Sequence, residues 1–134
     1  MDEVKKYLAC EGRASVIIAN TTKLVEEYRK EQNLTPTTTA VMGRFLTIAG
    51  IIGHTGIKSN NESITLQIKG GGPVGTLVSV VKKAENIVNV EGYIQNPQVE
   101  LPLKANGKIN VGAAVRKRWI FKFYKRKYNC KTSL

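Results

Sequence analysis

The feature that most constrains the fold is a run of three glycines and a proline that directly follows a strand-like segment. Apolar and polar residues alternate over 64–69, which is the pattern of a half-buried strand. Gly70, Gly71 and Gly72 can take positive φ angles, and Pro73 fixes the φ of the next step. We therefore expect a sharp reversal here, followed by a second strand over 77–82.

A second turn is predicted at Asn96-Pro97, after a further strand-like run over 87–94. Glu85-Asn86 marks the turn between this run and the preceding one. The middle of the chain is therefore expected to contribute three strands joined by turns.

The N-terminal residues predict a β-hairpin followed by an amphipathic helix. Two β-rich runs, over 4–9 and 13–20, are separated by Glu11-Gly12. Asn20, Thr21 and Thr22 then offer N-cap oxygens for a helix over 23–32, in which apolar and charged residues occupy opposite sides.

A second helix is predicted to begin at Thr35-Pro36, because threonine caps helices and proline is tolerated in the first turn. Two neighbouring apolar stripes follow at helical spacing. They consist of Val41, Phe45, Ile48 and Ile52, and of Met42, Leu46 and Ala49. A helix this apolar should be buried against a sheet. The predicted fold class is α+β, an antiparallel or mixed sheet with packed helices.

Three glycines within this second helix, Gly43, Gly50 and Gly53, lower its intrinsic stability by up to ~1 kcal/mol each relative to alanine. Close packing against another element is the usual compensation, so we expect the helix to approach its neighbours closely at these positions.

The positive charge of the chain is concentrated at its C-terminal end. The formal net charge is +11, and the 134 residues are enough for one domain. Residues 1–115 hold 13 Lys+Arg and 10 Asp+Glu, a net of +3, whereas residues 116–134 hold 8 basic and no acidic residues. The body is thus nearly neutral and the tail strongly basic.

Cysteine usage gives no sign of a metal site. Cys10 and Cys130 are far apart, with no C-x-C or C-x-x-C spacing. The polar N-terminus lacks the apolar stretch of a secretory signal, so we expect a cytoplasmic protein with Cys10 as a half-buried thiol. The most apolar segment, 40–57, is interrupted by Arg44 and His54 and does not favour a membrane span.

The sequence does not predict an enzyme. The segment G-G-G-P-V-G lacks the Lys-Ser/Thr of a P-loop and leads into a strand rather than a helix, so a structural turn is favoured over a phosphate cradle. The only histidine, His54, has no accompanying nucleophile and acid in a recognisable order, and is interpreted as a residue near a helix end.

Several consecutive blocks of residues 1–115 resemble the N-terminal core of the heat shock protein 33 family. They are A-N-T-T, T-P-T-T-T-A-V-M-G-R, I-K-G-G-G-P-V-G, N-P-Q-V-E-L-P-L and G-K-I-N-V-G-A-A-V, in this order. The resemblance implies a truncated form of the core domain of an ATP-independent holdase chaperone, which binds unfolded or aggregation-prone client proteins in the stress response.

The same resemblance implies a redox switch that this sequence lacks. Full-length members carry a C-terminal zinc domain with C-x-C and C-x-x-C motifs, whose oxidation releases the metal and exposes the client-binding surface. Those cysteines are missing here, and Cys10 and Cys130 do not match them. We therefore expect no cofactor in this chain, and a holdase without its zinc and cysteine switch.

The resemblance stops between Val115 and Arg116. Family members continue with a glycine-rich turn and a strand of the kind Gly-Lys-Asp-Gly-Phe-Leu. If A-rich codons for that segment gain a single A after the valine codon, they translate as R-K-R-W-I-F-K-F-Y-K, which matches residues 116–125. We hypothesise that residues 116–134 are out-of-frame sequence, the product of a frameshift.

Two other interpretations of the tail remain open. Its basic and aromatic residues are typical of a surface that binds single-stranded nucleic acid or an anionic membrane. The candidate residues are Arg116, Lys117, Arg118, Trp119, Phe121, Phe123 and Tyr124. The tail could also form an ordinary edge strand.

A sheet that ended after Val115 would leave an unpaired edge and uncovered apolar surface. On that basis we expect the chain to self-associate or to bind unfolding proteins.

The frameshift hypothesis makes a direct prediction about the coding DNA. Downstream of the codon for Val115, the alternative frame should restore family-like sequence and eventually the C-x-C and C-x-x-C cysteines. Sequencing the locus checks this, and an alternative frame that closes promptly would show that the tail is genuine coding sequence.

Overall fold

A computed structural model describes residues 1–116 and 120–127. The strands are β1 (Glu3–Ala9), β2 (Ala14–Asn20), β3 (Glu62–Lys69), β4 (Thr76–Ala84), β5 (Ile87–Ile94) and β6 (Ile120–Lys127), and the helices are α1 (Thr22–Glu31), α2 (Pro36–Gly56) and α3 (Val111–Val115).

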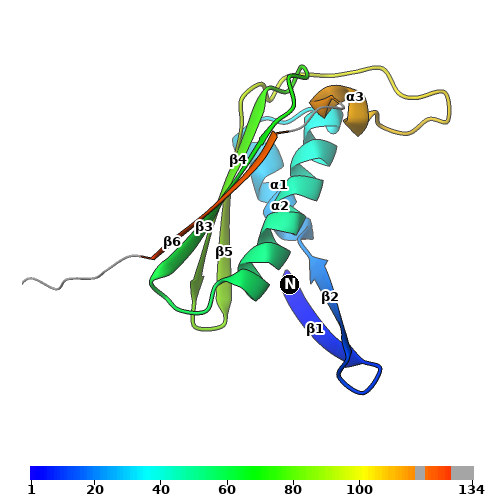
Figure 1. The fold of residues 1–134 in the computed structure, drawn as a ribbon. Coiled ribbons are helices and arrows are strands. Elements are labelled where there is room, and N and C mark those ends of the chain that lie inside the picture. Colours follow the sequence, from blue (N-terminus) through cyan, green and yellow to red (C-terminus); the bar gives the residue numbers. More distant parts are fainter. Residues whose placement is uncertain (117–119, 128–134) are drawn as a thin grey trace, which may run out of the picture.

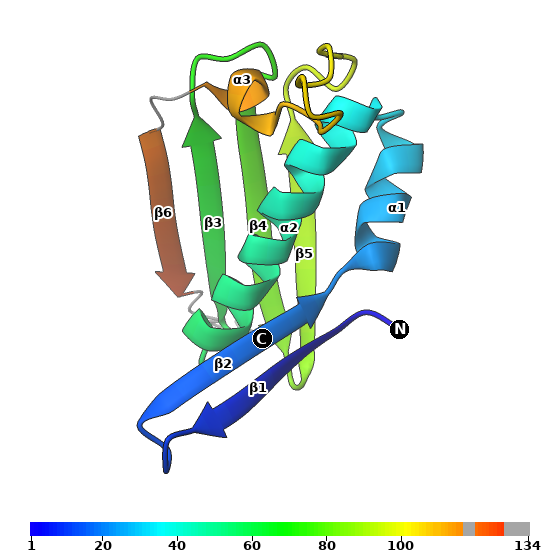
Figure 2. The ribbon, with the colours of Figure 1, turned by 90° about the vertical axis from the view of Figure 1, so that its right-hand side faces the viewer.

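The strands form two antiparallel sheets. β1 and β2 make a two-stranded ribbon, and the other four strands pair in the order β5-β4-β3-β6. Helices α1 and α2 lie on one side of the larger sheet, and α3 lies at its end near the β3–β4 loop (Figures 1 and 2). The predicted α+β class is confirmed.

The predicted hairpin is present, with Glu3 opposite Asn20 and Ala9 opposite Ala14. It projects beyond the helices (Figure 2). Its tip turns through Cys10, Glu11 and Gly12, all with positive φ. The expectation of a half-buried Cys10 is wrong: the side chain is exposed because it lies at this projecting turn, where nothing packs on it.

Helix α1 forms as predicted, and Asp2, which directly precedes β1, contributes to its N-terminal cap. Thr21 is the N-cap residue and makes no capping hydrogen bond through its side chain. Instead the Asp2 carboxylate accepts hydrogen bonds from the backbone N–H groups of Lys23 (3.0 Å) and Leu24 (2.6 Å). A carboxylate at a helix N-terminus satisfies free N–H groups and opposes the helix dipole. The cap therefore ties the hairpin to α1.

Helix α2 begins at Thr35-Pro36, as predicted, with a capping box between Thr35 and Thr38. Of the two apolar stripes, the one that contains Met42, Leu46 and Ala49 is fully buried. Ile48 is 51% exposed, so the stripe that contains it is buried only in part. The apolar surface of α2 is wider than the part that one sheet can cover. The sheet packs against the stripe centred on Leu46, so Ile48 remains exposed.

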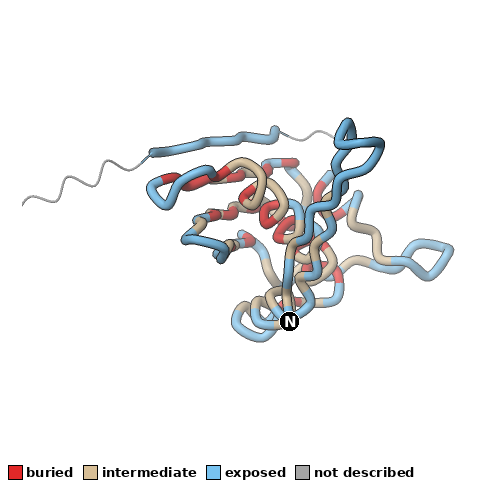
Figure 3. Tube along the Cα trace, turned by 90° about the horizontal axis from the view of Figure 1, so that it is seen from below, coloured by how far each residue is buried: buried red, intermediate tan, exposed pale blue. Residues whose placement is uncertain are grey.

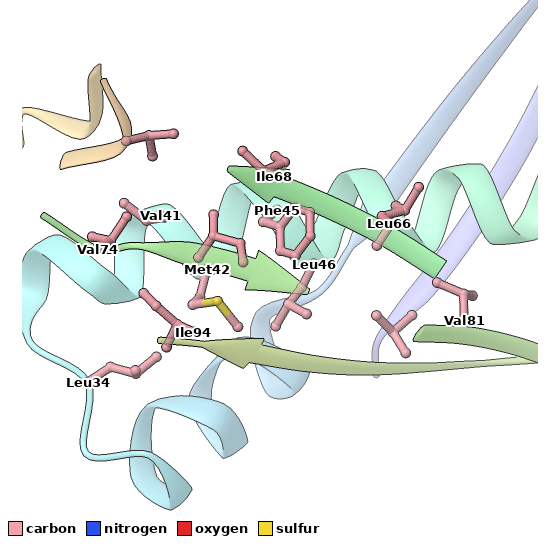
Figure 4. Packing of buried hydrophobic residues seen from close by; sticks show 14 of the residues in the cluster. Leu34, Val41, Met42, Phe45, Leu46, Leu66, Ile68, Val74, Val81 and Ile94 are labelled. Carbon is pink, nitrogen blue, oxygen red and sulfur yellow. The ribbon is translucent and has the colours of Figure 1, made fainter. Parts of the chain in front are cut away.

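The core lies between α2 and the sheet. Figure 4 shows Met42, Phe45 and Leu46 of α2 in the same layer as Leu66 and Ile68 of β3 and Val81 of β4. Buried residues concentrate in this layer, whereas the hairpin and β6 are mostly exposed along their lengths (Figure 3).

Two glycines allow helix and sheet to approach closely. A Cβ atom on Gly53 of α2 would overlap the Cγ1 of Val81 on β4, and one on Gly92 of β5 would overlap the Cδ2 of Leu46. The expected close packing is thus realised at Gly53. It is not required at Gly43 or Gly50, where a Cβ atom would lie 3.5 Å from Val25 and 3.7 Å from Val90 respectively, both ordinary contacts.

Residues 120–127 extend the sheet instead of leaving β3 as its edge. β6 pairs antiparallel with the whole of β3, from Glu62 opposite Lys127 to Lys69 opposite Ile120. The unpaired edge expected at this place is therefore covered, and β6 itself becomes the edge strand.

A buried carboxylate anchors β6. Glu62 is 4% exposed, and its carboxylate accepts a hydrogen bond from the backbone N–H of Lys58 (2.8 Å). The ammonium groups of Lys125 and Lys127 lie 3.2 and 3.8 Å from its two oxygens. The Lys58 hydrogen bond, followed by the Lys125 ammonium, lowers the pKa of Glu62 despite its desolvation.

Alanine substitutions at two glycines of α2 should have opposite effects. Gly53→Ala should lower the free energy of unfolding by about 1–3 kcal/mol, because the new methyl group overpacks the contact with Val81. Gly43→Ala should raise it by up to about 1 kcal/mol, because space is available and alanine favours the helix. Urea unfolding followed by circular dichroism checks both. Equal effects at the two sites would contradict the packing described.

The Glu62 anchor should depend on pH. Because its pKa is lowered in the folded state, the ionised carboxylate stabilises the fold above the unfolded-state pKa of about 4.3, and this contribution disappears as the pH falls through the folded-state value. Glu62→Gln should therefore lower the melting temperature at pH 7, and the difference from the wild type should shrink near pH 3.

The matched control is Glu100→Gln, which removes an exposed carboxylate with no ion pair among the described residues. Thermal unfolding of the three proteins at both pH values provides the measurement. If Glu62→Gln behaves like Glu100→Gln at pH 7, the anchor contributes nothing.

Candidate functional site

The sequence blocks singled out above converge at one end of the sheet. The Asn96 side-chain amide donates to the Pro73 carbonyl (2.8 Å), so the two predicted turns are in direct contact. The backbone N–H of Val74 donates to the carbonyl of Ala114 in α3 (3.3 Å). We call this meeting of residues 70–75, 96–101 and 110–116 with the start of α2 the loop junction.

The glycines of the β3–β4 loop serve two different purposes. Gly71 has the positive φ expected of a turn residue, at 71°. Gly70 and Gly72 are not among the positive-φ residues; they allow the loop to lie directly against α3. A Cβ atom on either would overlap a carbonyl oxygen, that of Val115 or of Ala114 respectively. Glycine is therefore required at Gly71 by the turn, and at Gly70 and Gly72 by the close contact with α3.

Threonines at the start of α2 hold the segment after the second turn. The Thr38 hydroxyl donates to the Pro97 carbonyl (2.7 Å), and the Thr35 hydroxyl donates to that of Val99. The Thr37 hydroxyl accepts from the backbone N–H of Leu101 (3.2 Å). The block T-P-T-T-T therefore caps its own helix and fixes the N-P-Q-V-E-L segment.

The contacts of the loop junction join separate loops of the chain to one another. Its contacts are mainly backbone groups satisfied by hydroxyl and amide side chains, and its G-G-G-P loop continues into β4, not into a helix that could hold an anion. It brings together no acid, base and nucleophile. The turn residues Gly70, Gly71, Gly72, Pro73, Asn96 and Pro97 are all part of it.

His54 lies in the last turn of α2, the position interpreted from sequence as a helix end. Desolvation lowers its pKa, and the nearby ammonium groups of Lys83, Lys6 and Lys58 lower it further. The imidazole is therefore neutral near pH 7 and sits in a cationic environment. Over residues 1–116 and 120–127, no group of three His, Cys, Asp or Glu side chains could hold a metal ion.

The candidate residues of the tail are only partly described. Arg116 adopts a positive φ of 75° and its guanidinium donates to the Gly71 carbonyl (3.4 Å), so it belongs to the loop junction. Phe121, Phe123 and Tyr124 lie on β6, each 48% exposed. Lys117, Arg118 and Trp119, like Cys130, lie outside the described residues.

The two phenylalanines face the helix side of the sheet, because they pair with Ile68 and Leu66 of β3, which are buried on that side. They remain half exposed because α2 packs over β3, β4 and β5 and β6 lies beyond it (Figure 2).

The hairpin presents an apolar face that sequence reasoning did not single out. Tyr7 pairs with Val16, and Ile18 lies on the same side two residues along β2. These side chains are 51%, 49% and 57% exposed. Of the apolar residues on the opposite side, Val4, Ile17 and Ala19 are half-buried, and only Leu8, near the tip, is exposed. The available signal was alternation of apolar residues in a ribbon of only two strands, which cannot bury both faces.

Two residues of the described structure act in ways no local pattern reveals. Asp2 caps α1, and Glu62 anchors β6, and both partners are distant in sequence. Among the described helices, none is both long and apolar enough to cross a membrane.

Comparisons with known proteins agree with the fold. A family model described as Hsp33 protein matches residues 2–131. A 33 kDa chaperonin of Thermus thermophilus is 42% identical over 115 residues, which are 86% of this chain and 33% of that protein. A 33 kDa chaperonin of Acetivibrio thermocellus is 42% identical over 114 residues, 85% of this chain and 37% of the relative.

The crystal structure of the 33 kDa chaperonin from Thermotoga maritima superposes with a TM-score of 0.80 at 27% identity, over 96% of this chain and 42% of that one. The chain thus spans about a third of the length of the sequence relatives it matches. Because the family match extends over nearly the whole chain and the fold agrees, the chain belongs to the Hsp33 family of chaperones.

Proposed function

We propose that this chain is an ATP-independent holdase that captures unfolded proteins without an oxidant. The observation that carries the proposal is the exposed apolar face of the hairpin, formed by Tyr7, Val16 and Ile18. Exposed apolar surface on a projecting ribbon is suited to bind the apolar segments that unfolding proteins present. Membership of a chaperone family supports this use of the surface.

The hairpin geometry favours capture over burial within the same chain. The inner side of the ribbon already packs towards α2, so its outer side is left for other molecules. The free backbone groups along the ribbon edges could also pair with an extended client segment. Phe121 and Phe123 supply a second, smaller apolar surface at the sheet edge.

The cysteines support the proposed independence from oxidation. Cys10 is exposed at the hairpin tip, and the spacing to Cys130 matches neither C-x-C nor C-x-x-C. We assign no zinc and no switch to this chain, in contrast to what the resemblance implies for full-length members. The division into a core portion over 1–115 and an out-of-frame tail over 116–134 remains a proposal, as does self-association through the same apolar surfaces.

Suppression of the aggregation of a heat-denatured client tests the function. The wild type should suppress aggregation without oxidant. Val16→Thr/Ile18→Thr keeps the β-branched shape but loses apolar surface worth about 1 kcal/mol per residue, so it should need on the order of tenfold more chaperone. Ile87→Thr, at the first residue of β5, where the side chain is 71% exposed, is the control and should behave as the wild type.

The same assay with peroxide or hypochlorous acid tests the absence of a switch. Activity should not rise on oxidation, in the wild type or in Cys10→Ser/Cys130→Ser. A strong oxidant-dependent gain that vanishes in the cysteine variant would overturn this part of the proposal. Equal losses in the hairpin variant and the Ile87 control would remove the hairpin as the binding face.

A further inference from the structure

The side of the four-stranded sheet opposite the helices carries a pattern that client capture does not use. Helices α1 and α2 cover one face only (Figures 1 and 2). On the other face the strands display alternate residues in cross-strand rows, which the registers define. We propose that this helix-free face binds single-stranded nucleic acid.

Positive charge dominates this face. Lys122 and Arg126 of β6 lie on it, since they pair with Gln67 and Ser63, whose neighbours along β3 are buried under α2. Lys82 of β4 lies in the same row as Arg126, and Lys69 lies at the other end of β3. The side chains of all four cations are exposed.

Acidic residues are scarce on the same face. Glu91 of β5, in the row of Thr65 and Val80, is the carboxylate that the described strands place there. Glu62, the other acidic strand residue of this sheet, pairs with Lys127, alternates with Ser63 and is buried. The surface is therefore complementary to a chain of phosphates.

Exposed aromatic rings supply the second element of the site. Tyr124 of β6 and Tyr93 of β5 are 48% and 55% exposed and lie on this face, opposite Thr65 and Val78 respectively. Base stacking on aromatic side chains is how single strands are held without reading a groove. Four-stranded antiparallel sheets with helices behind them and aromatic rings in front bind single-stranded RNA in this way, an analogy of architecture only.

The spacing suits an extended strand that crosses the sheet. Three inter-strand steps of ~4.8 Å separate β5 from β6, so the two tyrosines stand on strands about 14 Å apart. Gln67 and Thr65, both half-buried, lie between them and offer hydrogen-bonding groups to bases or sugars. Val78 and Val80 of β4 lie beside them on the same face, so the surface between the two tyrosines is partly polar and partly apolar. With cationic side chains around it, this surface fits the bases and phosphates of a nucleic acid strand.

An anionic membrane fits this face less well. Membrane-surface binding needs a continuous apolar stripe that enters the lipid, whereas here Thr65, Gln67, Thr76 and Asn89 break up the apolar positions. A second copy paired edge to edge with β6 fits poorly too, since Lys122, Lys125, Arg126 and Lys127 would be brought close to their equivalents.

The site combines residues of the tail with residues of the body. Its chemistry follows from the polypeptide as it exists and does not depend on how the codons of the tail arose. It is separate from the hairpin, so it stands or falls independently of the holdase proposal.

Fluorescence anisotropy with the full chain and a labelled 20-nucleotide single strand, DNA or RNA, is the test. Binding should be clearly tighter than to a duplex of the same length, since a flat sheet does not enter a groove. A plot of log affinity against log salt should have a slope of about −2 to −3, the value for three or four single-strand phosphates.

Paired variants with matched charge locate the site. Lys122→Gln/Arg126→Gln should weaken binding at least about tenfold and reduce the salt slope, whereas Lys104→Gln/Lys108→Gln removes the same charge from an exposed loop and should change affinity less than about twofold. Lys69→Gln/Lys82→Gln repeats the test on β3 and β4, so that the result does not rest on β6 alone.

The aromatic contribution is tested separately. Tyr93→Thr/Tyr124→Thr should weaken binding at least about fivefold per ring with little effect on the salt slope. Tyr7→Thr removes an equally exposed ring from the hairpin and should leave the affinity unchanged. Circular dichroism and thermal melting confirm that each variant is folded.

If Lys122→Gln/Arg126→Gln and Lys104→Gln/Lys108→Gln lower the affinity for the single strand equally, the proposal is overturned. Such a result would mean that the net charge attracts the nucleic acid without a defined site. Duplex binding as tight as single-strand binding, or no binding of either, would overturn the proposal too. Binding to phosphatidylserine vesicles with the same dependence on Lys122 and Arg126, in the absence of nucleic-acid binding, would identify the face as a membrane surface instead.

Discussion

The whole arrangement depends on how closely one long apolar helix can lie against the sheet. Gly53 on α2 and Gly92 on β5 lack the side chains that would hold the two layers apart, so Val81 packs against the helix at Gly53 and Leu46 packs against the sheet at Gly92. Other parts of the chain are attached to this helix. The hairpin and α1 pack along it, and its first turn, through Thr35 and Thr38, holds the loops that close the end of the sheet.

The residues that make the family recognisable are mainly those that build this arrangement. The glycine-rich loop lies against α3, the Asn96 amide joins two turns, and the threonines cap a helix while holding the distant loop segment over 97–101. Their described contacts are with other parts of the chain, and the surfaces that we propose for other molecules lie elsewhere. The hairpin outer face is apolar and the helix-free sheet face is cationic and aromatic, so the two favour different partners and respond differently to salt.

Local chemistry explains what could be predicted from the sequence. Strand alternation over 64–69, the Thr35-Pro36 helix start and the N-terminal hairpin depend on residues close together in the chain, and all are present. The sequence does not show which of the two stripes of α2 is buried against the sheet, because both are apolar. Only the position of the sheet, permitted by Gly53, decides that Leu46 is buried and Ile48 is exposed.

What could not be predicted depends on partners distant in sequence. Asp2 caps α1 from across the hairpin, beside the predicted Asn20, whose side-chain oxygen accepts from the backbone N–H of Thr22 (3.2 Å). Glu62 acquires its two ammonium partners, Lys125 and Lys127, only when β6 pairs with β3. Cys10 is exposed because the hairpin projects from the fold, and amino-acid composition does not reveal that projection. Likewise, Tyr93 and Tyr124 share a face only through the strand order.

The central functional claim is that the outer face of the hairpin touches unfolded proteins directly. Site-specific photo-crosslinking tests it: benzoylphenylalanine replaces Val16 in one protein and Ile87 in another, both exposed apolar positions on strands. On irradiation with a heat-denatured client and no oxidant, the probe at position 16 should form crosslinks to the client, and the probe at position 87 should form few. Crosslinking that is equal at the two positions, or absent at position 16, would contradict the account.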